Sequence, residues 1–106
     1  MRRREVVVTQ HAADDLSSAV RYIAKTLLNP QAAEKLLDEF DAMTARLTDE
    51  AESYAFVRDE VARASGYRWA EFGNYMAFFR IEEAANRVVI DRVSYNKRDW
   101  VKLLVK

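Results

Sequence analysis

The sequence predicts an α+β fold in which a helix hairpin packs on one face of a small, largely antiparallel sheet. Apolar residues recur at helical spacing over residues 10–28 and again over 30–48. After residue 66, Tyr, Trp, Phe, Val and Ile concentrate in three runs separated by turn-like residues. With a strand-like opening segment, this gives the order β-α-α-β-β-β-α, ending in a short helix. We expect residues 1–106 to form a single domain.

The first half predicts a strand followed by two helices. Three valines favour extended structure within residues 5–9, and Thr9 is a suitable N-cap for the helix that follows. The sequence Asn29-Pro30 ends that helix and begins the next, since Asn is a favoured N-cap and Pro is tolerated at the first helical position. This short connection predicts an antiparallel hairpin. The second helix carries a regular apolar stripe: Ala33, Leu36, Leu37, Phe40, Met43 and Leu47.

The second half predicts an antiparallel meander after a stretch that resists assignment. Residues 49–65 are mixed in character, and we assign no element there. The predicted strands span 66–72, 75–83 and 87–95. Alternation places Tyr75, Ala77, Phe79 and Ile81 on one face of the middle strand. In the last strand it places Val89, Asp91, Val93 and Tyr95 together, opposite Val88, Ile90, Arg92 and Ser94. Trp100, Leu103 and Leu104 predict the closing helix.

Composition excludes several classes of protein. The chain contains no cysteine, which excludes disulfides, thiolate metal sites and cysteine nucleophiles. Its two glycines cannot form a phosphate-binding loop, and its single histidine, His11, falls at a helix start, where a surface position is expected. No window approaches the roughly 20 apolar residues of a membrane span. We therefore expect a cytoplasmic protein without metal or cofactor.

Charge is unevenly distributed although the net charge is zero. Residues 11–65 carry six Lys/Arg against eleven Asp/Glu, whereas residues 66–106 carry eight against five. Arginines beside aromatics suit RNA, because guanidinium groups pair with phosphate and flat rings stack on bases. The alternative is that the aromatics form core and the cations are solvated. The cations of the predicted sheet and its end are Arg68, Arg80, Arg92, Lys97 and Arg98.

Several short motifs occur in order along the second half of the chain: Gly66-Tyr67-Arg68, Gly73-Asn74-Tyr75, Phe79-Arg80-Ile81 and Val93-Ser94-Tyr95-Asn96-Lys97-Arg98-Asp99. Together they resemble the RelE/ParE superfamily of toxins from bacterial type II toxin–antitoxin modules. The opening VVVTQHAADDL and the second-helix start at Asn29-Pro30 are also similar to that family, so the resemblance covers nearly the whole chain. The resemblance implies the same β-α-α-β-β-β-α fold.

The resemblance implies a growth-inhibiting toxin, of the kind that plasmid stabilisation systems carry, neutralised by a cognate antitoxin protein. RelE-like members cut mRNA on the ribosome without a metal, and ParE-like members inhibit DNA gyrase. A third alternative is a domain that only binds antitoxin. For cleavage, the resemblance implies Arg98 as a catalytic residue. We expect Tyr95, which is close to Arg98 in the sequence, and Arg68 to act with it, and we expect the cations Arg80, Arg92 and Lys97 to bind RNA. Another family cation falls on Met76 and two more fall near Trp69 and Glu71, and the family's C-terminal tyrosine falls near Leu104.

Overall fold

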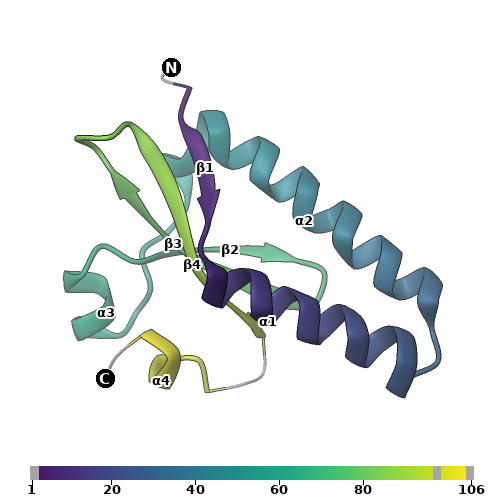
Figure 1. Ribbon diagram of the computed structural model, residues 1–106. Helices are drawn as coiled ribbons and strands as arrows, with labels where there is room; N and C mark the ends of the chain where they lie inside the picture. The colour runs from purple at the N-terminus through teal and green to yellow at the C-terminus, as the bar shows by residue number, and fades with distance from the viewer. Residues whose placement is uncertain (1–2, 97–98, 105–106) are drawn as a thin grey trace.

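The computed structural model describes residues 3–96 and 99–104, and its α+β architecture is the predicted one (Figure 1). A helix hairpin lies against one face of a four-stranded sheet with the order β1-β4-β3-β2. β1 pairs with β4 in parallel, and the other pairs are antiparallel. The elements are β1 Glu5–Val8, α1 Gln10–Arg21, η1 Tyr22–Thr26, α2 Pro30–Glu50, η2 Ala51–Ser53, α3 Glu60–Ala64, β2 Arg68–Phe72, β3 Tyr75–Glu82, β4 Arg87–Tyr95 and α4 Val101–Leu104.

Both predicted N-caps are confirmed. The Thr9 side chain accepts a hydrogen bond from the Ala12 N–H at the start of α1, and Asn29 accepts one from Ala32 at the start of α2. Between them the chain leaves α1 through one π-helical turn, η1. Leu28 then takes a left-handed conformation (φ 53°) that ends the hairpin's first arm. The two helices therefore return antiparallel to each other over a very short connection.

The sheet has side chains packed against both faces. The hairpin-facing cluster joins α1 and α2 to the sheet, and includes Leu36, Phe40, Met43, Leu47, Phe72, Phe79, Val88, Ile90 and Val93. The outer cluster, built on Val57, Ala62 and Phe78, also contains Tyr67, Trp69, Met76, Trp100 and Leu104. The Phe78 and Trp100 rings stack with centroids 4.9 Å apart. Residues 49–65, left unassigned from sequence, thus supply α3 and part of the cover for the outer face.

The predicted alternation is correct in β3 and wrong in β4. Phe78 pairs with Arg92, but the next residue of β3, Phe79, pairs with Ile90, so Asp91 is an extra residue in a β-bulge. The bulge shifts the alternation by one residue. As a result Val88, Ile90 and Val93 all belong to the hairpin-facing cluster, although strict alternation separates Val88 and Ile90 from Val93.

One carboxylate from α1 stabilises this bulge. Asp15 accepts two hydrogen bonds from the Arg92 guanidinium, at 2.8 and 3.0 Å, and a third from the Val93 backbone N–H at 3.0 Å. Both side chains of the ion pair are largely buried, with exposed fractions of 20% for Asp15 and 23% for Arg92. The backbone N–H of Val93, close to the bulge, thus donates to a side chain of α1 and not to a neighbouring strand.

We predict that Asp15→Ala destabilises the fold by about 2 kcal/mol, since it removes charge-assisted hydrogen bonds and leaves the largely buried Arg92 charge without its partner. Asp14→Ala is the matched control: Asp14 is exposed, and among the described residues its side chain accepts a hydrogen bond from Gln10 of the same helix. Its effect should stay below about 0.5 kcal/mol. Urea unfolding of both variants measures the difference, and equal stabilities would contradict the assigned role of Asp15.

Candidate functional site

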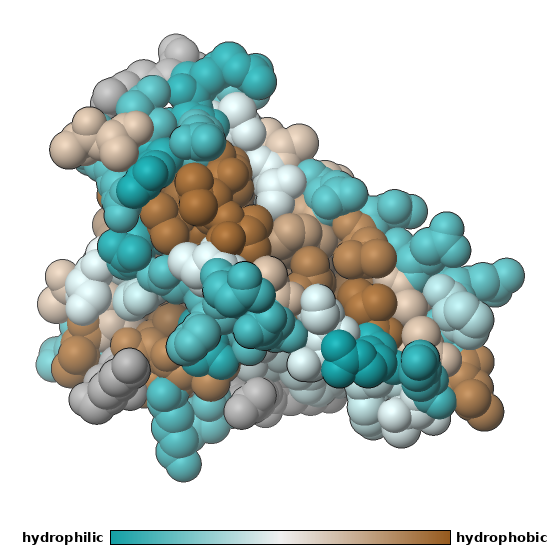
Figure 2. Space-filling model, in the orientation of Figure 1, coloured by the Kyte–Doolittle hydropathy of each residue, from teal (hydrophilic) through white to brown (hydrophobic). Residues whose placement is uncertain are grey.

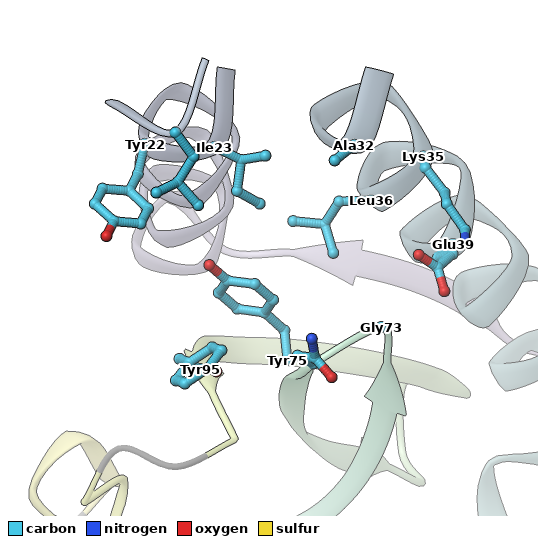
Figure 3. Close-up of a pocket in the computed structure, with 11 residues that line it drawn as sticks. Tyr22, Ile23, Ala32, Lys35, Leu36, Glu39, Gly73, Tyr75 and Tyr95 are labelled. Carbon is cyan, nitrogen blue, oxygen red and sulfur yellow. The ribbon is translucent and has the colours of Figure 1, made fainter. Parts of the chain in front are cut away.

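A groove lies between the helix hairpin and the turn that joins β2 to β3. It has a volume of about 610 Å³, and three tyrosines line it: Tyr22 from η1, Tyr75 from β3 and Tyr95 from β4 (Figure 3). The Tyr75 ring projects into the space below Tyr22 and Leu36, with Tyr95 beside its base. A second hollow of about 320 Å³ shares all three tyrosines and extends toward Asp15 and the bulge. The candidate site is therefore continuous with the bulge of β4.

Local backbone geometry fixes the positions of two of these tyrosines. Of the two residues in the β2–β3 turn only Gly73 has a positive φ (56°), the pattern of a type II′ hairpin. A Cβ at Gly73 would lie 3.2 Å from the Leu36 side chain, so glycine also allows the turn to approach α2 closely. The antiparallel pairing of β3 with β4 places Tyr75 opposite Tyr95, and their rings meet edge-to-face with centroids 5.5 Å apart.

The electrostatics of the groove keep its innermost tyrosine protonated. Burial raises the pKa of Tyr75, and the neighbouring Tyr95 and Tyr22 raise it further because two phenolates would repel each other. A phenol in this state is a hydrogen-bond donor and an apolar contact surface, and is not a base at neutral pH. Tyr22 and Tyr95 are exposed, at 52% and 43%, so the groove offers aromatic surface to a partner.

Arg68, predicted as catalytic, holds a loop. Its guanidinium donates to the backbone carbonyls of Glu52 (3.2 Å) and Tyr54 (2.7 Å) and lies 3.9 Å above the Phe56 ring. Arg68 pairs with Phe79 on β3, whereas Tyr95 pairs with Tyr75. Four positions along a strand span about 13 Å. The structure therefore does not bring Arg68 and Tyr95 into one site.

The two sheet arginines predicted to bind RNA each contact a carboxylate. Arg80 Nε donates to Asp91 at 2.7 Å, and Asp91 also accepts from the Tyr67 hydroxyl at 2.9 Å. The hydrogen bond to Asp91 raises the pKa of the Arg80 guanidinium, as the one to Asp15 does for Arg92. Lys97 and Arg98, the remaining predicted cations, lie outside the described residues.

Two structural observations limit other kinds of site. Within residues 3–96 and 99–104, no group of three or more His, Asp or Glu side chains is arranged to hold a metal ion. No helix in the same part of the chain has the length and hydropathy needed to cross a membrane.

The comparison with protein families decides the identity of the fold. Residues 6–100 match the family model described as the ParE toxin of the type II toxin–antitoxin system parDE. The chain belongs to this family. A comparison with curated proteins found no match. This ParE-family chain is thus the toxin component of a type II toxin–antitoxin system.

Two solved structures share its fold. The chromosomal ParDE system from P. aeruginosa is similar with a TM-score of 0.69 at 22% identity, over 87% of this chain and 95% of that one. The RelBE2 toxin–antitoxin complex from Mycobacterium tuberculosis has a TM-score of 0.58 at 24% identity, over 88% and 98% of the two chains. These structures show the shared fold, and the match to the family model over residues 6–100 confirms the superfamily that the motifs indicated.

Sequence reasoning missed Tyr22 and the structural role of Asp15. The sequence pattern places Tyr22 on a predicted helix, far along the chain from the predicted strands. The packing of the helix hairpin on the sheet places it in the same groove as Tyr75 and Tyr95. Asp15 was one of two adjacent acidic residues near a helix start, and its partner Arg92 is 77 positions away. An available signal was Asp91, a charged residue on a face otherwise predicted to be apolar.

We predict that stability falls as the pH rises above about 10, the ordinary pKa of tyrosine. The pKa values of Tyr67 and Tyr75 are raised in the folded chain, mainly by burial. The unfolded state therefore loses its protons first, and the stabilisation present below pH 10 disappears as pH approaches the folded values. Urea unfolding between pH 9 and 12 tests this. The Tyr67→Phe/Tyr75→Phe double variant should lose less stability than the parent, and equal losses would contradict the assignment.

Proposed function

We propose that this toxin arrests growth by binding a protein target, DNA gyrase, as ParE-like toxins do. The observation that carries the proposal is the state of the sheet arginines. Arg68 is held by two carbonyls and a ring, and Arg80 and Arg92 are each paired with a carboxylate. Cations engaged in this way are poorly placed to bind the phosphates of an RNA.

RNA cleavage would require Arg80 and Arg92 to give up their carboxylate partners. Attack of a 2′-hydroxyl on phosphate needs a base, an acid and cations that stabilise the developing charge. To reach a phosphate, Arg80 or Arg92 would have to leave Asp91 or Asp15, and a carboxylate left behind repels the same phosphate. Met76 also occupies a position where the resemblance implies a cation, and Glu71 is close to another such position.

The exposed apolar surface supports binding to a protein. Tyr22, Leu27 and Leu28 are exposed by 52%, 54% and 81%, and Tyr22 and Leu27 line the tyrosine groove. Aromatic and aliphatic side chains gathered beside a groove are typical of protein interfaces, where Tyr often carries much of the binding energy. We therefore place the contact with the target at the end of the hairpin and the groove beneath it.

The toxin also needs a neutralising partner. Both solved structures are described as toxin–antitoxin systems, which supports a cognate antitoxin for this chain. Neutralisation and target binding both place this toxin in the cytoplasm, where gyrase acts.

Ribosome-dependent, metal-independent mRNA cleavage is the second candidate. Tyr95 favours it, because this residue is exposed by 43% at the end of β4, three positions before Arg98 in the sequence. In that case Tyr95 and Arg98 act on the mRNA, and Lys97 binds it.

The deciding experiment measures gyrase supercoiling and mRNA integrity on translating ribosomes with the same purified toxin. We expect supercoiling to be inhibited and the mRNA to remain intact. Leu27→Ser should weaken inhibition by tenfold or more, since it removes apolar contact surface at the groove. Val61→Ser is the matched control, because Val61 is exposed by 58% on α3, outside the groove.

Each other outcome has a distinct meaning. Intact supercoiling with cut mRNA would establish the nuclease, and Tyr95→Phe should then slow cleavage. Intact supercoiling with intact mRNA would leave a domain that only binds antitoxin. Equal inhibition by the Leu27 and Val61 variants would contradict the proposal that the target binds at the groove.

A further inference from the structure

The connection between the two helices of the hairpin contains an unusual backbone conformation. Within residues 3–96 and 99–104, two residues other than glycine have a positive φ: Leu28 at 53° and Asn86 at 51°. Left-handed backbone suits glycine, and asparagine tolerates it better than most side chains, which accounts for Asn86 in the β3–β4 turn. Leucine gains nothing from this conformation, because its Cβ lies too close to the following carbonyl oxygen.

The left-handed turn at Leu28 reverses the chain between the helices. The N–H of Asn29 donates to the Ile23 carbonyl at 3.0 Å, over the end of η1, and the Asn29 side chain then caps α2. Glycine is the usual residue where a helix ends in a left-handed turn. The geometry of the connection therefore favours glycine at this position, but the sequence has leucine.

The Leu28 side chain also contributes little to the packing of the chain. It is exposed by 81%, more than any other large hydrophobic side chain in the described part of the chain. The described residues that line the tyrosine groove include Leu27 and not Leu28. Figure 2 shows hydrophobic surface at this end of the hairpin, at the right of the view, next to hydrophilic residues. Neither the backbone nor the core accounts for leucine here, so its role lies in a contact outside the chain.

The charges near Leu28 restrict the chemistry of its partner. Residues 16–33 include Arg21 and Lys25, both exposed, and contain no Asp or Glu. The end of the hairpin is thus an exposed apolar side chain with cations on the same arm, in a chain whose net charge is zero. The complementary surface is an apolar pocket bordered by carboxylates.

We propose that Leu28 is an anchor residue that enters an apolar pocket with an acidic border on the toxin's protein target. This inference rests on the proposed function and adds which side chain enters the target and what chemistry the target offers. The short, hydrogen-bonded turn fixes the backbone of the anchor before binding, so less conformational freedom is lost in the complex. The groove receives a side chain of the target, whereas Leu28 is received by the target.

The test compares stability with activity in Leu28→Gly. Because glycine relieves the left-handed strain, the urea-unfolding midpoint should equal or exceed that of the parent. Inhibition of gyrase supercoiling should nevertheless weaken by about tenfold or more, since the buried apolar contact is lost. Leu28→Met keeps an apolar side chain of similar volume and should inhibit within about threefold of the parent. A Leu28→Gly variant that inhibits as well as the parent, or unfolds at lower urea, would overturn the proposal.

Two controls isolate the side chain from the backbone. Leu28→Asn introduces a residue that tolerates left-handed backbone, and it should lose as much inhibition as Leu28→Gly, which excludes the flexibility of glycine as the cause. Asn86→Gly changes the other non-glycine position with a positive φ, in the β3–β4 turn away from the hairpin connection (Figure 1), and should inhibit like the parent. Equal losses in Asn86→Gly and Leu28→Gly would contradict the role of Leu28.

The acidic border of the target pocket is tested separately by binding to purified gyrase. The Arg21→Gln/Lys25→Gln double variant should bind about fivefold more weakly than the parent and should lose less affinity than the parent as salt is added. Equal affinity and equal salt dependence of the two proteins would overturn the acidic border.

Failure of the proposed function is distinguishable from failure of this inference. If the parent leaves supercoiling unchanged, gyrase is not the target, and induced expression in cells then tests Leu28 with any target. Leu28→Gly should need about tenfold more toxin for the same growth arrest, and equal arrest would overturn the proposal. Binding of the parent to vesicles of phosphatidylcholine and phosphatidylglycerol, lost in Leu28→Gly, would identify a lipid surface as the occupant and overturn the protein pocket.

Discussion

The hydrogen bonds between Asp15 and the bulge of β4 are the interaction on which the candidate site depends. Asp15 binds the Arg92 guanidinium and the Val93 N–H, and the hydroxyl of Thr9, the N-cap of α1, donates to the Asp91 carbonyl. Both contacts join the start of α1 to the irregular point of the last strand. Because the bulge shifts the alternation, Val93 reaches the hairpin-facing core and Tyr95 reaches Tyr75 and Tyr22. Without this shift, each residue of β4 after Asp91 would place its side chain on the opposite face of the sheet.

The same region of the structure shows that Arg80 and Arg92 are paired with carboxylates. The number of arginines in the sheet indicates a phosphate-binding surface. A carboxylate that pairs with an arginine offsets its positive charge, so the number alone does not show which arginines can bind phosphate. Here the bulge residue Asp91 contacts Arg80, and Asp15 contacts Arg92. At the N-terminal end, the buried Arg4 pairs with Glu52 and Glu83. The tyrosine groove exposes Tyr22, Leu27 and Tyr95, and this surface supports the proposal that this ParE-family toxin binds a protein target.

The tyrosine groove is separate from the hollow beside β1. The groove offers side-chain surface from Tyr22, Tyr75 and Tyr95, so it suits an apolar anchor. The hollow beside β1 is lined by Val6, Val8 and residues of α2. No residue lines both, although α2 borders each of them.

The sequence by itself determined the element order, both N-caps, the apolar stripe of α2 and the alternation of β3, because these depend on contacts between near neighbours in the chain. It also indicated the superfamily, through motifs spread over nearly the whole chain. Only the tertiary structure decided the bulge at Asp91, the pairing of Asp15 with Arg92, the outer cluster around Phe78 and the meeting of three tyrosines. Each of these joins residues far apart in the chain, and a local pattern carries no information about which distant group will satisfy a charge or cover a ring.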